Sequence, residues 1–99
     1  GTEYFISYES GEKLLAYLRL RLDDNATVRE LKVTGQAANI GKTGTGVQHM
    51  GLGSKLMKIA EEKSKSYPKI RVTHGPGTRL YYEKLGYELN EYYMVKDLA

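Results

Sequence analysis

The sequence contains no cysteine. This absence excludes disulfide bonds, thiolate metal sites, iron–sulfur clusters and a cysteine nucleophile within these 99 residues. No run approaches the ~20 apolar residues that a membrane-spanning helix needs, and the first residues do not resemble a signal peptide. We therefore expect a protein of a reducing compartment, the cytoplasm, with no membrane partner.

The chain also has few histidines and only a small net charge. Two histidines make no metal site, and no Ser–His–Asp or Cys–His combination that would activate a nucleophile is recognisable. The net charge of +3 lies in the second half, since residues 47–99 hold nine basic and six acidic residues. A surplus of this size fits a phosphate-rich ligand or RNA, and it fits an ordinary solvated surface equally well.

Hydrophobic alternation predicts a sheet in the first third of the chain. With 40% hydrophobic residues, the chain has room for one compact domain, residues 1–99. Strands are expected over residues 3–10, 16–22 and 27–35. In the second strand, alternate residues share one face and should be buried: Ala16, Leu18, Leu20 and Leu22.

At Leu52 the spacing of the hydrophobic residues changes from the alternation of a strand to the period of a helix. A helix of about four turns is predicted from there to the Tyr67-Pro68 break, with Leu52, Leu56, Ile59, Ala60 and Lys63 on one face. A strand over residues 69–75, a short helix over 77–86 ended by Gly86, and a hairpin over 87–98 follow. The order predicts an α/β (α+β) fold with a mixed sheet around a central strand–helix–strand unit.

Glycines are concentrated just before the expected long helix. A Walker A loop is excluded there, because five residues instead of four separate Gly35 from Gly41. The better candidate is the spacing Gln48-x-x-Gly51-x-Gly53, which leads directly into the helix. Glycines let an anion approach the backbone, and the free N–H groups and the dipole of a helix start point at the same place. This loop is therefore predicted to bind a phosphate-containing ligand.

The glycine motif and the segment YYEKLGY at residues 81–87 together resemble the two signature segments of the GNAT acyltransferases, which bind acetyl-CoA. Longer segments resemble the C-terminal acetyltransferase domain of the Elongator catalytic subunits, which modify the wobble uridine of tRNA: VRELKVTG, QHMGLGSKLMKIAEE, KIRVTHGPGTRLYYEKLGYEL and YYMVKDL. They cover most of residues 28–98. The resemblance implies a GNAT-like, mainly antiparallel sheet without the N-terminal strand and helices of a complete GNAT domain.

The resemblance also implies residue roles. The acetyl-CoA-binding residues it implies are Glu30, Leu31, Lys32, Val33, Gln48, His49, Met50, Gly51, Leu52, Gly53 and Ser54. Tyr82 matches the tyrosine that reaches the acetyl-CoA sulfur, where a phenol can protonate the departing thiolate. Because Tyr81 and Leu85 are four residues apart, we expect them to face the sheet and to leave Tyr82 turned toward the cofactor.

In the family, the domain works with tRNA and with a radical S-adenosylmethionine domain. The cluster of that domain needs cysteines, so it cannot lie within these residues. Two other functions remain open at this point: a stand-alone acetyltransferase acting on a lysine or small amine, and a non-catalytic RNA-binding or docking module with the same fold.

Overall fold

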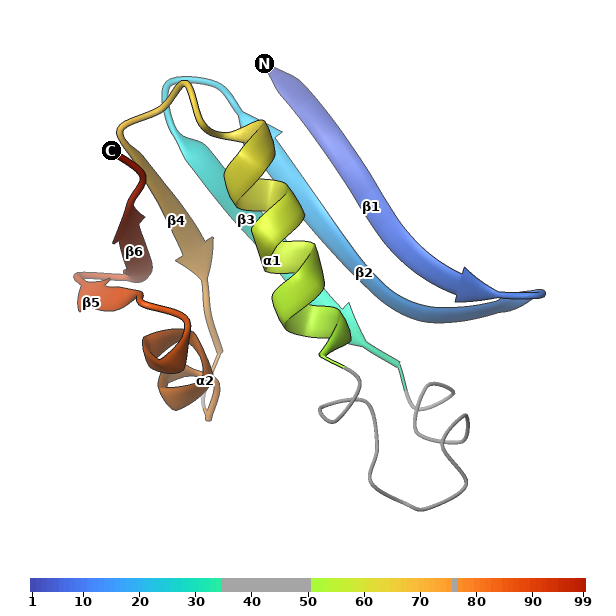
Figure 1. Cartoon of the computed structure of the whole chain (residues 1–99). Coiled ribbons are helices and arrows are strands. Elements are labelled where there is room, and N and C mark those ends of the chain that lie inside the picture. Colours follow the sequence, from blue (N-terminus) through green and yellow to red (C-terminus); the bar gives the residue numbers. More distant parts are fainter. Residues whose placement is uncertain (35–50, 76) are drawn as a thin grey trace.

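The computed structural model describes residues 1–34, 51–75 and 77–99. Within these residues, six strands form one sheet in the order β1-β2-β3-β4-β6-β5, and two helices accompany it (Figure 1). The elements are β1 (Thr2–Ser10), β2 (Lys13–Leu22), β3 (Ala26–Val33), α1 (Leu52–Lys63), β4 (Lys69–Thr73), α2 (Arg79–Lys84), β5 (Glu88–Asn90) and β6 (Tyr93–Asp97).

The predicted strand–helix–strand unit is confirmed. β3 and β4 pair in parallel on either side of α1 in the chain, and every other neighbouring pair of strands is antiparallel. The predicted α1 is too long, because the helix ends at Lys63 and not at the Tyr67-Pro68 break. There the N–H of Ser64 still donates to the carbonyl of Ala60, and the next residues form a turn closed by the Tyr67 N–H on the Ser64 carbonyl.

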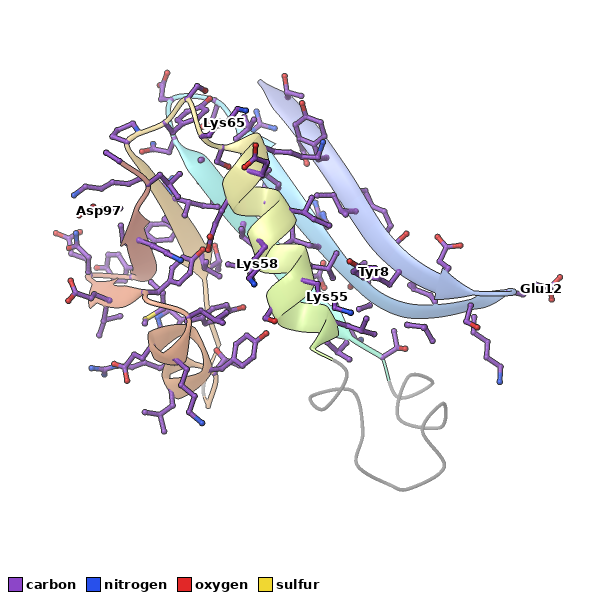
Figure 2. All side chains as sticks on the ribbon, in the orientation of Figure 1. Tyr8, Glu12, Lys55, Lys58, Lys65 and Asp97 are labelled. Atoms are coloured by element: carbon purple, nitrogen blue, oxygen red, sulfur yellow. The ribbon has the colours of Figure 1, made fainter. Side chains whose placement is uncertain are left out.

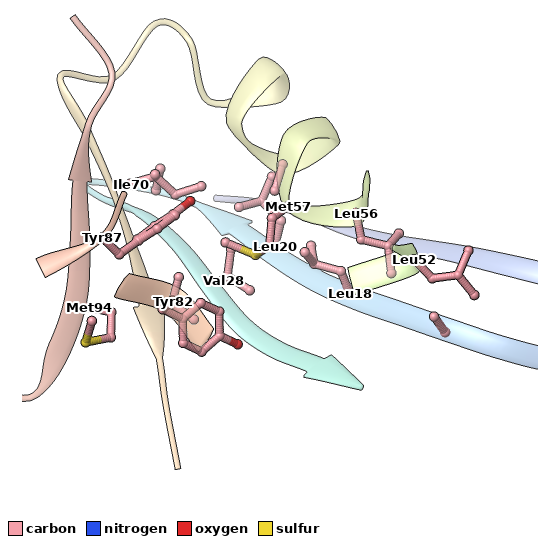
Figure 3. Close-up of a cluster of buried hydrophobic side chains, with 14 of the residues drawn as sticks. Leu18, Leu20, Val28, Leu52, Leu56, Met57, Ile70, Tyr82, Tyr87 and Met94 are labelled. Carbon is pink, nitrogen blue, oxygen red and sulfur yellow. The ribbon is translucent and has the colours of Figure 1, made fainter. Parts of the chain in front are cut away.

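One face of the sheet holds the core. Ala16, Leu18 and Leu20 are fully buried as predicted, because they alternate along β2 beneath α1, whereas Leu22 at the end of the strand is only half-buried. Figure 3 shows Leu18 and Leu20 in this core. The face of α1 that packs on them differs from the prediction at its edges. Met57 is buried, whereas Ile59 is half-buried. The remaining core side chains from the helix are Leu52, Leu56 and Ala60.

The outer side of α1 is solvated. Lys55 and Lys58 project from it into solvent (Figure 2). Lys63 was expected on the buried face, but its side chain is exposed, with its ammonium 4.5 Å from the centre of the Tyr4 ring on β1. A long cationic side chain at the edge of a buried face can cover apolar surface while its charge stays in water. Neither helix of the described residues has the length and apolar composition needed to cross a membrane.

β3 and β4 run together for only part of their length. The parallel pairing joins Ala26–Val28 to Ile70–Val72, while β3 continues to Val33. Beyond Val28 the two strands part, and the starts of α1 and α2 lie at this end of the sheet (Figure 1). This parting of the strands opens the centre of the sheet and leaves room for a site.

A polar junction fixes α2 relative to α1. The Tyr87 hydroxyl donates to Glu61 Oε2 of α1 at 2.7 Å, and Lys96 Nζ of β6 lies 3.3 Å from the same carboxylate. Gly86 has φ of +96°, which confirms it as the residue that ends α2. The ring of Tyr87 also packs edge-on against Tyr82, with 6.0 Å between ring centres. The junction therefore holds the second helix at the open end of the sheet.

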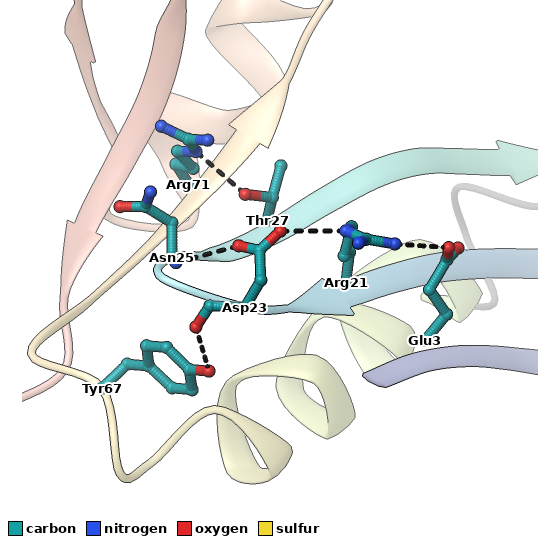
Figure 4. Close-up of polar contacts among 7 residues, drawn as sticks. All are labelled: Glu3, Arg21, Asp23, Asn25, Thr27, Tyr67 and Arg71. Atoms are coloured by element: carbon teal, nitrogen blue, oxygen red, sulfur yellow. Dashed lines mark hydrogen bonds and ion pairs between the residues drawn. The ribbon is translucent and has the colours of Figure 1, made fainter. Parts of the chain in front are cut away.

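The opposite face of the sheet carries no helix in the described part of the chain. We call it the open face, and its residues include Glu3, Phe5, Tyr17, Arg19, Arg21, Thr27, Glu30, Arg71 and Tyr93. Two of its arginines pair with carboxylates on a neighbouring strand: Arg19 with Glu30, and Arg21 with Glu3 (Figure 4).

Candidate functional site

A cleft of about 320 Å³ lies where β3 and β4 part. Its walls come from the last residues of β3, the first turn of α1 and the segment that leads into α2. The lining residues are Leu31, Val33, Gly51, Gly53, Ser54, Gly77, Thr78, Tyr81 and Tyr82. The cleft brings together the two segments that the sequence marked, the glycine motif and the tandem tyrosines.

The start of α1 offers backbone donors to this cleft. Gly51 precedes the helix with φ of +67°, a left-handed conformation that suits glycine, and no side chain caps the helix. The N–H groups of Leu52, Gly53 and Ser54 have no acceptor within the helix, because the carbonyls four residues back precede it. No acidic residue occupies the first turn. Gln48, His49 and Met50, the rest of the predicted loop, lie outside the described residues.

Gly53 faces the hydroxyl of Tyr81. A Cβ atom at position 53 would overlap that hydroxyl oxygen, and it would lie 3.9 Å from a methyl of Leu31. A side chain at this position would therefore push Tyr81, which lines the cleft, out of place.

The last residues of β3 divide between the two faces of the sheet. Leu31 and Val33 line the cleft, while the Glu30 side chain points to the open face and accepts a 2.6 Å hydrogen bond from the Tyr17 hydroxyl. That hydrogen bond, with Arg19 beside it, holds the pKa of Glu30 below its ordinary value, which makes this carboxylate a weaker base. Neither Glu30 nor Lys32 lines the cleft, and their part in binding stays a prediction.

The two tyrosines of α2 have exchanged the orientations that we expected. Tyr82 is 5% exposed, in the core, with its hydroxyl directed away from Tyr87 (Figure 3), and Tyr81 is 36% exposed. The expectation failed because Leu85 is four residues from Tyr81 but three from Tyr82, and both spacings place side chains together on a helix. Both tyrosines still line the cleft.

Burial changes the acidity of both phenols. It raises the pKa of Tyr82 to about 12, with the neighbouring Tyr81 as a smaller contribution. It also raises the pKa of Tyr81. Both hydroxyls therefore keep their protons at neutral pH and can act as hydrogen-bond donors.

Sequence reasoning did not assign Tyr81, Gly77 or Thr78 to the site. The clue was available in the combination of a glycine inside a helix start with two adjacent aromatic residues, since a missing Cβ makes room for a ring. Which of the two rings enters that room depends on the packing of α2. In the described part of the chain, no three His, Cys, Asp or Glu residues group as metal ligands would.

The chain is similar over nearly its whole length to longer proteins of known name. It is 44% identical to the tRNA uridine(34) acetyltransferase of Methanocaldococcus jannaschii and 39% identical to the bovine Elongator complex protein 3, with 99% of this chain aligned in each case. It spans only 21% of the length of each relative. No protein-family model matches it.

Solved structures agree in fold. The Elp3 protein of Methanocaldococcus infernus superposes with a TM-score of 0.80 at 41% identity, covering 97% of this chain and 26% of that one. The PaiA N-acetyltransferase of Thermoplasma acidophilum, solved in complex with coenzyme A, superposes with a TM-score of 0.68 at 17% identity, covering 96% and 60%.

The parted strands, the glycine-rich helix start and these likenesses define a GNAT-type acetyltransferase domain. The predicted mixed, mainly antiparallel GNAT-like fold is thereby confirmed. Among these proteins, the chain is similar in sequence to one segment, about a fifth of the length, of the tRNA uridine(34) acetyltransferase of Methanocaldococcus jannaschii and of bovine Elongator complex protein 3.

Proposed function

We propose that the chain binds acetyl-CoA in the cleft between β3, α1 and α2, as the acetyltransferase domain of a longer Elongator-type enzyme that modifies C5 of the tRNA wobble uridine. The observation that carries the proposal is the start of α1. Three backbone N–H groups without helical acceptors stand beside Gly53, a position where a Cβ would collide with Tyr81. Free N–H groups at a helix start, together with the positive end of the helix dipole, form a site that suits an anion.

The residues of the cleft suit the parts of acetyl-CoA. The N–H groups of Leu52, Gly53 and Ser54 would hold the pyrophosphate, assisted by the positive end of the α1 dipole. The backbone of β3 from residue 30 to 33 would lie along the pantetheine arm, with Leu31 and Val33 as its apolar wall. Gln48, His49 and Met50 join the pyrophosphate loop on the strength of the sequence motif.

Bound acetyl-CoA would supply an activated acetyl thioester. The chain itself would contribute hydrogen-bond donors to the reaction. A backbone N–H near Val33 would polarise the acyl carbonyl, and the hydroxyl of Tyr82 would hold a proton for the sulfur. A phenol with a pKa of about 12 is protonated at neutral pH, so it is a donor in its resting state. The Tyr81 hydroxyl, which lies against Gly53, is a second donor in the same wall.

Further partners follow from the relatives. Their names include tRNA uridine(34) acetyltransferase and Elongator complex protein 3, and this chain matches about a fifth of their length. A tRNA acceptor in the cytoplasm and a radical S-adenosylmethionine domain outside these residues fit that relation. The absence of cysteine places any iron–sulfur cluster of such an enzyme outside this chain.

Calorimetric titration with acetyl-CoA tests the proposal. Gly53→Val should abolish measurable binding, since the new side chain displaces Tyr81 from the wall of the cleft. Gly75→Val is the matched control, because a Cβ at position 75 meets nothing within 4 Å. Equal affinity of a folded Gly53→Val variant and the control would overturn the assignment of the cleft. Absence of binding to the unaltered chain would favour the non-catalytic docking module.

A further inference from the structure

A second hollow lies on the open face, on the opposite side of the sheet from the acetyl-CoA cleft. It measures about 290 Å³ and is bordered by β2, β3, β4 and β6. Its lining residues are Arg21, Asp23, Thr27, Arg29, Arg71, Thr73 and Tyr93. Three arginines therefore face one small depression, and the proposed acetyl transfer uses none of them.

Arg71 is held in place by uncharged groups. Its Nε donates to Thr27 Oγ1 at 2.9 Å (Figure 4), and its guanidinium carbon lies 4.1 Å from the centre of the Tyr93 ring. These contacts orient the guanidinium plane and leave its two terminal nitrogens for another partner. Within residues 1–34, 51–75 and 77–99, no carboxylate lies within ion-pair distance of Arg71 or Arg29.

The nearby carboxylates are already engaged. Arg21 Nη1 lies 2.8 Å from Glu3 Oε2, and its Nε lies 2.9 Å from Asp23 Oδ2 (Figure 4). The other oxygen of Asp23 accepts the backbone N–H of Asn25 at 3.0 Å. This hydrogen bond and Arg21 hold the pKa of Asp23 below its ordinary value, so the carboxylate stays ionised and paired. Neither Glu3 nor Asp23 forms an ion pair with Arg29 or Arg71.

We propose that this hollow binds a phosphate group between the guanidinium groups of Arg29 and Arg71. A guanidinium presents paired N–H donors in a plane that matches two oxygens of a phosphate, and a second guanidinium engages the remaining ones. The hydroxyl of Thr73, at the edge of the hollow, adds a neutral donor. The phosphate belongs either to a strand of RNA or to a small phosphate ester, because both present the same oxygens.

The binding test is an NMR titration of the isotope-labelled chain with inorganic phosphate and, separately, with a short single-stranded RNA. Either ligand should shift the Arg71 Nε–H signal and the amide signals of Arg29 and Thr73. Larger shifts and tighter binding with RNA would identify a phosphodiester strand as the ligand. Equal affinity for both would identify a small phosphate ester. If neither ligand shifts these signals at low salt, the proposal is wrong.

Matched variants separate a built site from general charge. Arg29→Gln and Arg71→Lys should each weaken the binding about tenfold, the loss of one charge-assisted contact or one bidentate fork. Arg19→Gln removes an equal charge from the same face, but Arg19 is already paired with Glu30 and should change the affinity less than about twofold. Equal losses in Arg29→Gln and Arg19→Gln would overturn the proposal, because they indicate charge alone.

The outcome is independent of the acetyl-CoA cleft. Gly53→Val alters the opposite side of the sheet and should leave phosphate binding in the hollow unchanged. Arg29→Gln, in turn, should leave acetyl-CoA affinity unchanged. Arg29 is exposed, so its replacement removes no buried contact. Unchanged acetyl-CoA affinity would therefore also show that the Arg29→Gln variant is folded.

Discussion

The two faces of the sheet are made by the same strands and yet have different chemistry. On the covered face, alternate residues of β2 such as Leu18 are fully buried against α1, and a phenol at the cleft has its pKa raised to about 12. The intervening residues of β2 point to the open face. They are arginines and an aromatic residue that contact side chains on the neighbouring strands. The comparison shows that period-two alternation gives one sheet a buried apolar face and a solvated, charged face.

The difference between the faces is also energetic. Burying a leucine side chain is worth about 1.5–3 kcal/mol, whereas an exposed ion pair contributes about 0–1 kcal/mol. The ion pair of Arg21 with Glu3 is of the second kind, with both side chains more than a third exposed. We therefore expect the covered face to determine stability and acetyl-CoA turnover, and the open face to determine the binding of the second, phosphate-containing ligand.

The largest expected effect tests whether the chemistry belongs to the covered face. Tyr82→Phe in the longer enzyme should keep acetyl-CoA affinity and slow thioester cleavage by about 10²- to 10⁴-fold, the usual contribution of a general acid. Release of the coenzyme A thiol measures the rate. Tyr17→Phe, which removes a phenol from the open face, should leave the rate unchanged.

Tyr81→Phe completes this comparison. Its hydroxyl lies against Gly53 at the cleft wall, so it is the alternative donor to the sulfur. If Tyr81→Phe slows cleavage and Tyr82→Phe matches the unaltered enzyme, the general acid is Tyr81 and Tyr82 only supports it from the core.

The next effect concerns stability. Leu18→Ala on the covered face should lower the free energy of unfolding by about 3 kcal/mol, because it leaves a cavity beneath α1. Phe5→Ala on the open face should cost less than about 1 kcal/mol, since Phe5 is 63% exposed and mainly stacks on Tyr17. Urea unfolding measures both. Similar losses would mean that the open face is packed in solution.

The smallest effect is a pH dependence. Between pH 10 and about 12, the Tyr82 phenol loses its proton in the unfolded chain but keeps it in the fold. The unfolded state then binds fewer protons, so the free energy of unfolding falls as pH rises through this range, by up to about 2 kcal/mol for this group. Tyr82→Phe should remove that part of the alkaline loss. Tyr92→Phe, at an 82% exposed position, should not.

Much of the fold could be predicted from the sequence. The alternation in Ala16, Leu18 and Leu20 identified the buried face of β2, and the change of period at Leu52 marked the start of α1. Gly86 marked the end of α2, where φ is +96°. These features are local, so residues within a few positions of one another determine them.

The orientation of the two tyrosines was beyond the sequence, because Leu85 lies at helical spacing from both. Tertiary packing decides between them. The Tyr87 hydroxyl is anchored by Glu61, which lies 26 residues away in the sequence, so no local pattern predicts this contact. Tyr82 packs on the anchored Tyr87 ring. The charged hollow of the open face was missed for the same reason. Arg71 and Thr27 are 44 residues apart and meet only through the parallel pairing of β3 and β4.

The parting of β3 and β4 has one further consequence. In the described part of the chain, β3 beyond Val28 is paired with β2 on one side only, so the sheet has an edge strand in its middle. At the rim of a sheet, such an edge is a template on which other extended chains can add and aggregate. Here the edge lies beside a cleft whose walls include α1 and α2, so a ligand bound there as we propose would meet the unpaired backbone groups of this strand.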